Sequence, residues 1–227
     1  MDMNKFLELM SDKGISIITD NVLQFSKKSS FTVTPSNESC IKFNDPENYC
    51  IYINTTELTK ECEYVFLHEF FHCVQFEEGY PHVFAKNEDY DNLASEFGSS
   101  ILDFDIRCRL EKYGYYDHLK QLKNGLKTMN HLFNLIEIQG DKNSLTHLEN
   151  ISHGTFFASV ASTKRLDKEL VPVLQLASKA SPKTYETYKI INKCFKMYNC
   201  NSKMGMYKIF KKLLIQLELD EYLTMTN

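Results

Sequence analysis

Two histidines and a glutamate stand close together in residues 64–76, whose sequence is YVFLHEFFHCVQF. His68 and His72 are four residues apart, so a helix places them one above the other on one face, with Cβ atoms about 5–6 Å apart. Two imidazole nitrogens in that position can bind one Zn²⁺. Glu69 lies beside the same face, where it can hold a water molecule and accept its proton without binding the metal. The spacing therefore predicts a zinc site suited to hydrolysis.

The rest of this segment is almost entirely apolar, which predicts a helix buried on most of its sides. Its plainly polar residues are His68, Glu69, His72 and Gln75. Burying a carboxylate and two imidazoles costs several kcal/mol unless they find partners. A bound cation would offset that cost, and we therefore interpret the group as a metal site rather than as two incidental histidines.

The H-E-x-x-H pattern with uncharged residues on both sides resembles the zincin metallopeptidases. The resemblance covers roughly residues 49–113 and is specific at His68, Glu69 and His72. It implies a zinc-dependent enzyme that hydrolyses a peptide bond through a metal-activated water, with Glu69 as the general base. The expected substrate is a peptide or a protein.

A catalytic zinc takes three protein ligands and leaves a fourth position for water. Glu96 stands 24 residues after His72 and begins a polar stripe on the next predicted helix, followed by Ser100, Asp103 and Arg107. Gluzincins, the thermolysin-like zincins, supply a glutamate from such a helix, and this resemblance makes Glu96 the expected third ligand. Gluzincins often also carry an aspartate one turn further on. Here Ser100 has that position, and Asp103 is the nearest acid on the stripe.

Other third ligands stay open. Glu78, six residues after His72, would be the metzincin-like choice, but metzincins need a glycine where this chain has Gln75. The remaining candidates are His82, Glu88 and Asp91.

Hydrolysis also needs a donor for the oxyanion that develops on the substrate. His153, in the sequence ISHGT, is the expected donor, although a capping or partly buried histidine is the simpler interpretation of this residue. The other candidates are Tyr80, Tyr113 and His147.

The N-terminal half is expected to combine a small sheet with the motif helix. We expect a helix at residues 2–12, strands at 15–19 and 31–34, a hairpin of 40–43 with 49–53, and helices from Thr55 or Thr56 to Glu78 and at 90–113. A hairpin before a buried motif helix is also the zincin layout. The predicted fold is therefore α+β, with a small N-terminal sheet packed on the H-E-x-x-H helix.

The second half is expected to be helical throughout. The predicted helices are residues 117–139, 144–164, 166–180, 184–198 and 204–219. This pattern predicts a zincin-like subdomain at residues 1–114 and a helical subdomain at 115–227, packed together or forming one continuous domain.

Composition limits the partners. A formal net charge of −4 with three arginines gives no basic stripe for nucleic acid. No apolar run approaches the roughly 18 residues of a membrane span, and residues 1–10 are too short and too acidic for a signal peptide. Seven cysteines without a C-x-x-C pair indicate reduced thiols. We therefore expect a cytoplasmic protein that binds neither nucleic acid nor membrane.

Two other functional classes stay open. The chain could be a zincin-fold metal sensor with little or no turnover. It could also be an interaction module whose last helix docks a partner, although core packing is the simpler interpretation of that helix's apolar stripe. The stripe consists of Met206, Ile209, Phe210, Leu213 and Leu217.

Overall fold

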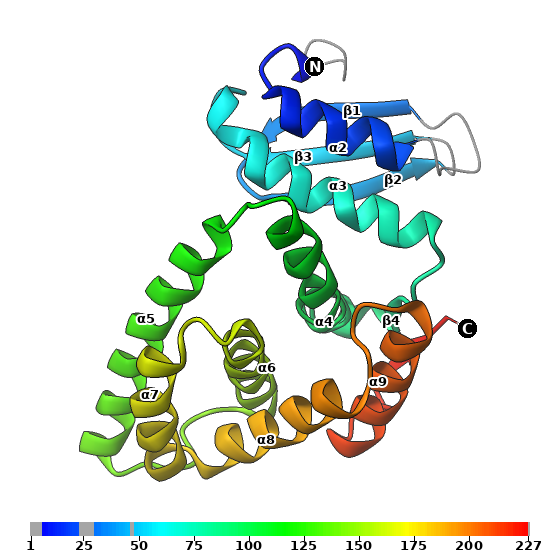
Figure 1. The fold of residues 1–227 in the computed structure, drawn as a ribbon. Coiled ribbons are helices and arrows are strands. Elements are labelled where there is room, and N and C mark those ends of the chain that lie inside the picture. Colours follow the sequence, from blue (N-terminus) through cyan, green and yellow to red (C-terminus); the bar gives the residue numbers. More distant parts are fainter. Residues whose placement is uncertain (1–5, 23–29, 46–47, 227) are drawn as a thin grey trace. The chain divides into compact units, whose positions relative to one another are not determined.

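The computed structural model describes residues 6–22, 30–45 and 48–226. It is a mixed α+β structure with small sheets and a majority of helix, so the fold class is confirmed in this coarse form (Figure 1). Within the described part, no helix combines the length and the apolar character needed to cross a membrane.

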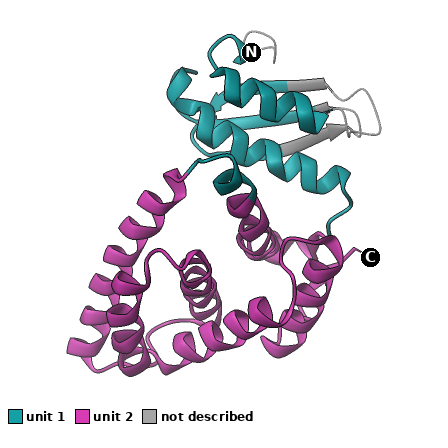
Figure 2. Cartoon of the chain, viewed as in Figure 1, with its two compact units in different colours: residues 1–80, 109–115 teal, residues 81–108, 116–227 magenta. Residues whose placement is uncertain are grey.

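The chain forms two compact units (Figure 2). Unit 1 contains Met1–Tyr80 and Arg109–Tyr115, and unit 2 contains Pro81–Cys108 and Tyr116–Asn227. This division differs from the expected one after residue 114 because helix α4, Asp91–Lys112, contributes to both units.

Unit 1 contains a three-stranded sheet. Its strands are β1 (Ser30–Ser36), β2 (Cys40–Asp45) and β3 (Asn48–Asn54), in the order β1-β3-β2. β3 pairs antiparallel with β2, with Ile41 opposite Ile51, and parallel with β1. The hairpin and the strand at 31–34 are thus confirmed. Tyr49, Ile51 and Ile53 alternate along β3 and are buried, as a strand with one covered face requires.

Helices α2 (Asp12–Val22) and α3 (Glu63–Glu77) lie across the same face of this sheet (Figure 1). The strand expected at residues 15–19 is wrong, because these residues belong to α2. The buried residues of α2 have helical spacing and are Gly14, Ile17, Ile18 and Asn21. Burial of this face outweighs the strand preference of β-branched residues. The helix expected at 2–12 lies partly outside the described residues, and the described residues after Phe6 form only a short helical turn.

The motif helix begins later than expected. Thr55 forms a local turn with Glu57, and a short 3-10 helix, Lys60–Cys62, leads into α3. The expected end is confirmed: α3 stops before Gly79, which has a φ of 71° that favours glycine.

Unit 2 is mainly helical and agrees closely with prediction. Its further helices are α5 (Asp117–Gln139), α6 (His147–Thr163), α7 (Asp167–Ala180), α8 (Pro182–Met197) and α9 (Lys203–Gln216). α5 packs on α7, and α6 packs on α8. The apolar stripe predicted on the last helix is buried, which supports core packing rather than docking. A short antiparallel pair, β4 (Val83–Ala85) with β5 (Leu223–Met225), was not predicted, because three residues are too few to show a period.

Candidate metal centre

Helix α3 is buried on most of its surface, as its sequence predicts. Phe66, Leu67, Phe70 and Val74 have no exposed surface. Its packing includes a ring contact between Phe66 and Phe6 at a centroid distance of 4.8 Å. This burial fixes the rotation of the helix and therefore the direction in which its polar residues point.

The first turn of α3 is anchored by Glu63. Its carboxylate accepts hydrogen bonds from the backbone N–H and the hydroxyl of Ser11, and from the hydroxyl of Tyr115. Burial opposes the charge on Glu63, but the bonds from Tyr115 and Ser11 outweigh it and lower its pKa. The helix start is thus tied to two segments distant in sequence.

The end of α3 is anchored to the last turns of α4. Arg109 donates two hydrogen bonds to Glu78, at 2.9 and 2.6 Å, and a third to the hydroxyl of Tyr80. The ring of Tyr113 also stacks on Phe71. Glu78, the metzincin-like alternative, is therefore engaged by a guanidinium group at both carboxylate oxygens.

His68 and His72 lie on the same side of α3. Their ring centroids are 5.2 Å apart and the rings meet edge to face at 80°. Both residues are half-buried, so the pair is accessible to a ligand while lying on a buried helix. This is the arrangement that the four-residue spacing predicts.

An aspartate from α4 completes a group with these histidines. One ligand atom from each of His68, His72 and Asp103 lies within 4.8 Å of the other two.

The carboxylate of Asp103 is itself oriented by Arg107. Arg107 Nη2 donates to Asp103 Oδ2 at 2.9 Å, and the guanidinium also donates to the hydroxyl of Ser159 on α6. Asp103 Oδ1 is buried. A carboxylate with a fixed orientation is better prepared to bind a cation than a freely rotating one.

Glu69 is 8% exposed and directly follows His68 in the sequence. Four residues on, Cys73 has no exposed surface. Burial, followed by the negative charge of Glu69, raises the pKa of the Cys73 thiol well above its ordinary value. Cys73 is therefore a protonated core residue.

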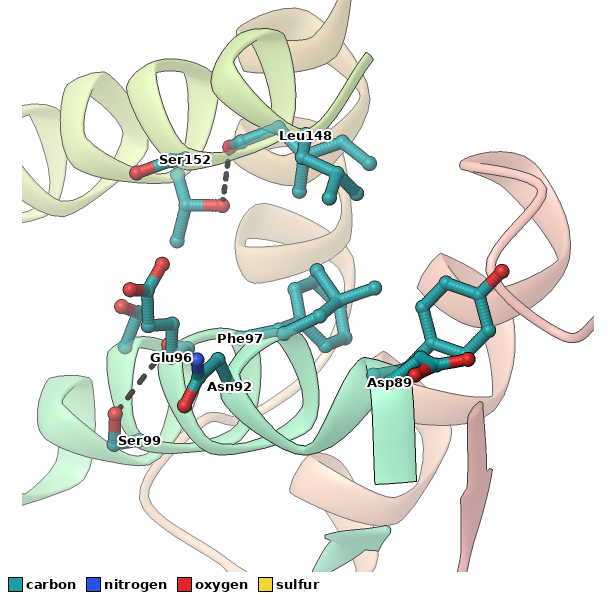
Figure 3. Close-up of a pocket in the computed structure, with 12 residues that line it drawn as sticks. Asp89, Asn92, Glu96, Phe97, Ser99, Leu148 and Ser152 are labelled. Atoms are coloured by element: carbon teal, nitrogen blue, oxygen red, sulfur yellow. Dashed lines mark hydrogen bonds between the residues drawn. The ribbon is translucent and has the colours of Figure 1, made fainter. Parts of the chain in front are cut away.

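Glu96, the expected third ligand, is not part of the His68–His72–Asp103 group. It is exposed on α4 and lines a pocket of unit 2, where it faces residues of α6 (Figure 3). Asp103, which is in the group, belongs to the same polar stripe of α4 as Glu96. The sequence feature that could have indicated Asp103 is Arg107, four residues later. An arginine at this spacing on a helix can pair with the carboxylate of Asp103 and orient it.

His153 lies on α6, and its ring meets that of Phe133 edge to face at 6.0 Å. Burial lowers its pKa, while the charge of nearby Glu149 opposes this shift. These surroundings agree with the simpler interpretation of a partly buried histidine, and its role as an oxyanion donor stays a prediction.

The remaining candidates have varied surroundings. His147 Nε2 lies 3.1 Å from the carbonyl oxygen of Leu217. Glu88 and Asp91 are exposed around the start of α4, and His82 adjoins β4. Among the described residues, none of these joins a second group of three potential metal ligands.

No protein-family model, curated protein or solved structure matches this chain. The resemblance to zincins therefore depends on the motif residues themselves, and the geometry around them carries the functional argument.

Proposed function

We propose that this protein is a zinc-dependent metallopeptidase in which His68, His72 and Asp103 bind the metal and Glu69 is the general base. The observation that carries the proposal is the approach of the three ligand atoms to within 4.8 Å of one another. The zincin resemblance of the motif adds the expected reaction, hydrolysis of a peptide bond.

The group fits a catalytic zinc in ligand type and spacing. Two imidazoles and a carboxylate are a common ligand set for catalytic zinc, with a fourth position open for water. With bonds of about 2.0–2.2 Å, tetrahedral ligand atoms lie about 3.3–3.5 Å apart. The present separations therefore need to shorten by at most about 1.5 Å, which side-chain rotation can supply.

Asp103 replaces Glu96 in this proposal for a geometric reason. The two acids are seven residues apart on α4, or about 10.5 Å along the helix axis. They share a stripe, but one ion cannot bind both. The carboxylate that lies with the two histidines is that of Asp103.

Zinc bound by these ligands would supply a Lewis acid that activates water and polarises a carbonyl group. Glu69 takes the proton of the attacking water and passes it to the leaving amine, which is the role of a general base that becomes a general acid. Glu69 is 8% exposed, so its carboxylate is largely shielded from bulk water. Arg107 keeps Asp103 oriented throughout.

Metal content of purified variants, measured by mass spectrometry, tests the ligand set. We expect about one zinc per chain in the wild type and in Glu96→Gln, and strongly reduced zinc in His72→Ala and Asp103→Ala. Circular dichroism would show that each variant is folded. Zinc loss in Glu96→Gln with retention in Asp103→Ala would instead make Glu96 the ligand.

Hydrolysis of a mixed peptide library, followed by mass spectrometry, tests the reaction. Glu69→Gln should keep its zinc and lose cleavage, because a carboxamide cannot accept the proton of water. A wild-type protein with zinc but no cleavage would favour the alternative of a metal sensor. Two histidines with one carboxylate also suit Fe²⁺. The measurement of metal content described above therefore also decides which metal is bound.

We also propose that the enzyme acts in the cytoplasm on a peptide or protein. Support for the compartment comes from the cysteines, since none of the seven forms a disulfide. The net charge of −4 supports the exclusion of nucleic acid as a partner.

A further inference from the structure

A pocket of about 600 Å³ lies in unit 2 between the first turns of α4 and the start of α6 (Figure 3). This volume is within the range of small-ligand sites, about 300–1,000 Å³. The pocket is lined by Asp89, Tyr90, Asn92, Leu93, Glu96, Phe97, Ser99, Ser100, Leu148, Ile151, Ser152 and Thr155.

The lining combines apolar surface with negative charge. Leu93 and Leu148 are the more accessible apolar residues of the lining and can contact the hydrocarbon part of a ligand. Asp89 and Glu96 are the charged members of the lining, and no basic residue is among them. The chemistry therefore complements a ligand with an aliphatic stem and a cationic end.

The helix dipoles do not reverse this preference. The N-termini of α4 and α6 each carry about half a positive charge, whereas the two carboxylates carry full negative charges. The start of α6 is already occupied by a capping box, in which Glu149 accepts from the backbone and hydroxyl of Thr146. Asp91 lies in the first turn of α4. An anion would meet Asp89 and Glu96 as like charges.

We infer that this pocket binds the side chain of a lysine or arginine in the peptide substrate, with Glu96 as its main ionic partner. That the basic side chain belongs to a substrate rests on the proposed peptidase function. That the pocket binds a basic side chain does not depend on it. Glu96 thereby changes from expected metal ligand to specificity residue.

Glu96 is two helical turns from Asp103, about 10.5 Å along the axis of α4, so it is not needed for the proposed metal site and is available to a ligand of the pocket.

Binding can be tested without cleavage by NMR titration of the Glu69→Gln protein with N-acetyl-lysine methylamide. The neutral isostere N-acetyl-norleucine methylamide is the matched ligand. We expect the lysine derivative to bind more tightly, with the shifted resonances in α4 and α6. Glu96→Gln should weaken its binding about three- to tenfold, and Glu137→Gln, which removes an exposed acid from α5, should leave it unchanged.

Equal binding of the two ligands, or an unchanged affinity in Glu96→Gln, would overturn the inference. Cleavage provides an independent test with wild-type enzyme and peptides that carry lysine or norleucine at each position near the cleaved bond. We expect a preference for lysine at one of these positions, reduced in Glu96→Gln. Cleavage without this preference contradicts the specificity role alone. Lysine binding without zinc or cleavage supports the pocket and contradicts the proposed peptidase.

Discussion

Arg107 donates a hydrogen bond to Asp103 across one turn of α4, with Nη2 2.9 Å from Oδ2. The two side chains are 19% and 16% exposed, so the pair is largely screened from water. Asp103 is also the carboxylate that lies within 4.8 Å of His68 and His72. Arg107 therefore holds the orientation of a carboxylate that belongs to the candidate metal centre.

Replacement of Arg107 should weaken metal binding without removing a ligand. We expect Arg107→Gln to bind zinc about 10- to 100-fold more weakly, because the orientation of Asp103 is lost. Competition with a chelator would measure the affinity. Arg165→Gln, which removes an arginine that lies over Tyr116, is the matched control and should bind zinc as the wild type does. An unchanged affinity in Arg107→Gln would exclude this supporting role.

Glu78→Gln should lower stability and leave the metal in place. The change removes the charge from a paired carboxylate that is partly open to solvent, with a side chain 32% exposed, so we expect a loss of about 0.5–1 kcal/mol in the free energy of unfolding. Urea denaturation would measure it, and a double-mutant cycle with Arg109→Ala would isolate the pair. Loss of zinc in folded Glu78→Gln would restore the metzincin-like assignment.

Gly154→Ala should destabilise the packing of α6 on α8. A Cβ at Gly154 would lie 2.6 Å from Thr187 Cγ2 and 2.9 Å from the backbone nitrogen of Tyr188. Since one of these neighbours is backbone, the helices must separate, and we expect a loss of about 1–3 kcal/mol in thermal or urea unfolding. Gly98→Ala is the matched control, because its Cβ would lie 3.7 Å from Val83 Cβ, an ordinary contact. It should be neutral or stabilising.

His153 should make stability fall in mildly acidic solution. Burial lowers its pKa below the ordinary value of 6.5, so the unfolded chain binds a proton more readily than the folded one. The contribution of His153 to the free energy of unfolding is fully present above pH 6.5. It is lost as the pH falls from 6.5 through the lower pKa of the folded state. Urea midpoints measured from neutral pH downward should show this decrease in wild type and a smaller one in His153→Gln.

Carboxylates such as Glu149 change the stability in a separate, more acidic pH range. Glu149 has a lowered pKa because it accepts bonds from the backbone and hydroxyl of Thr146, so its contribution is present above 4.5 and is lost as the pH falls through the lower folded value. A decrease confined to this range, and absent near 6.5, would contradict the assignment to His153.

Much of the fold follows from local patterns. The period of apolar residues predicted α5 at its observed bounds and the end of α3 near Glu78. Local preference failed at residues 15–19, where burial of Ile17 and Ile18 on a helical face prevailed over strand propensity. Pairing of β4 with β5 joins residues about 140 positions apart, which no local period can predict.

The sequence by itself determined that His68 and His72 share a helix face beside Glu69, because a four-residue spacing is enough to decide it. It also determined that the stripe containing Glu96 and Asp103 could supply a carboxylate. Helical periodicity cannot distinguish residues two turns apart on one stripe, since both point in nearly the same direction. Only the tertiary structure decided that a ligand atom of Asp103 lies within 4.8 Å of those of His68 and His72, because that proximity joins segments distant in sequence.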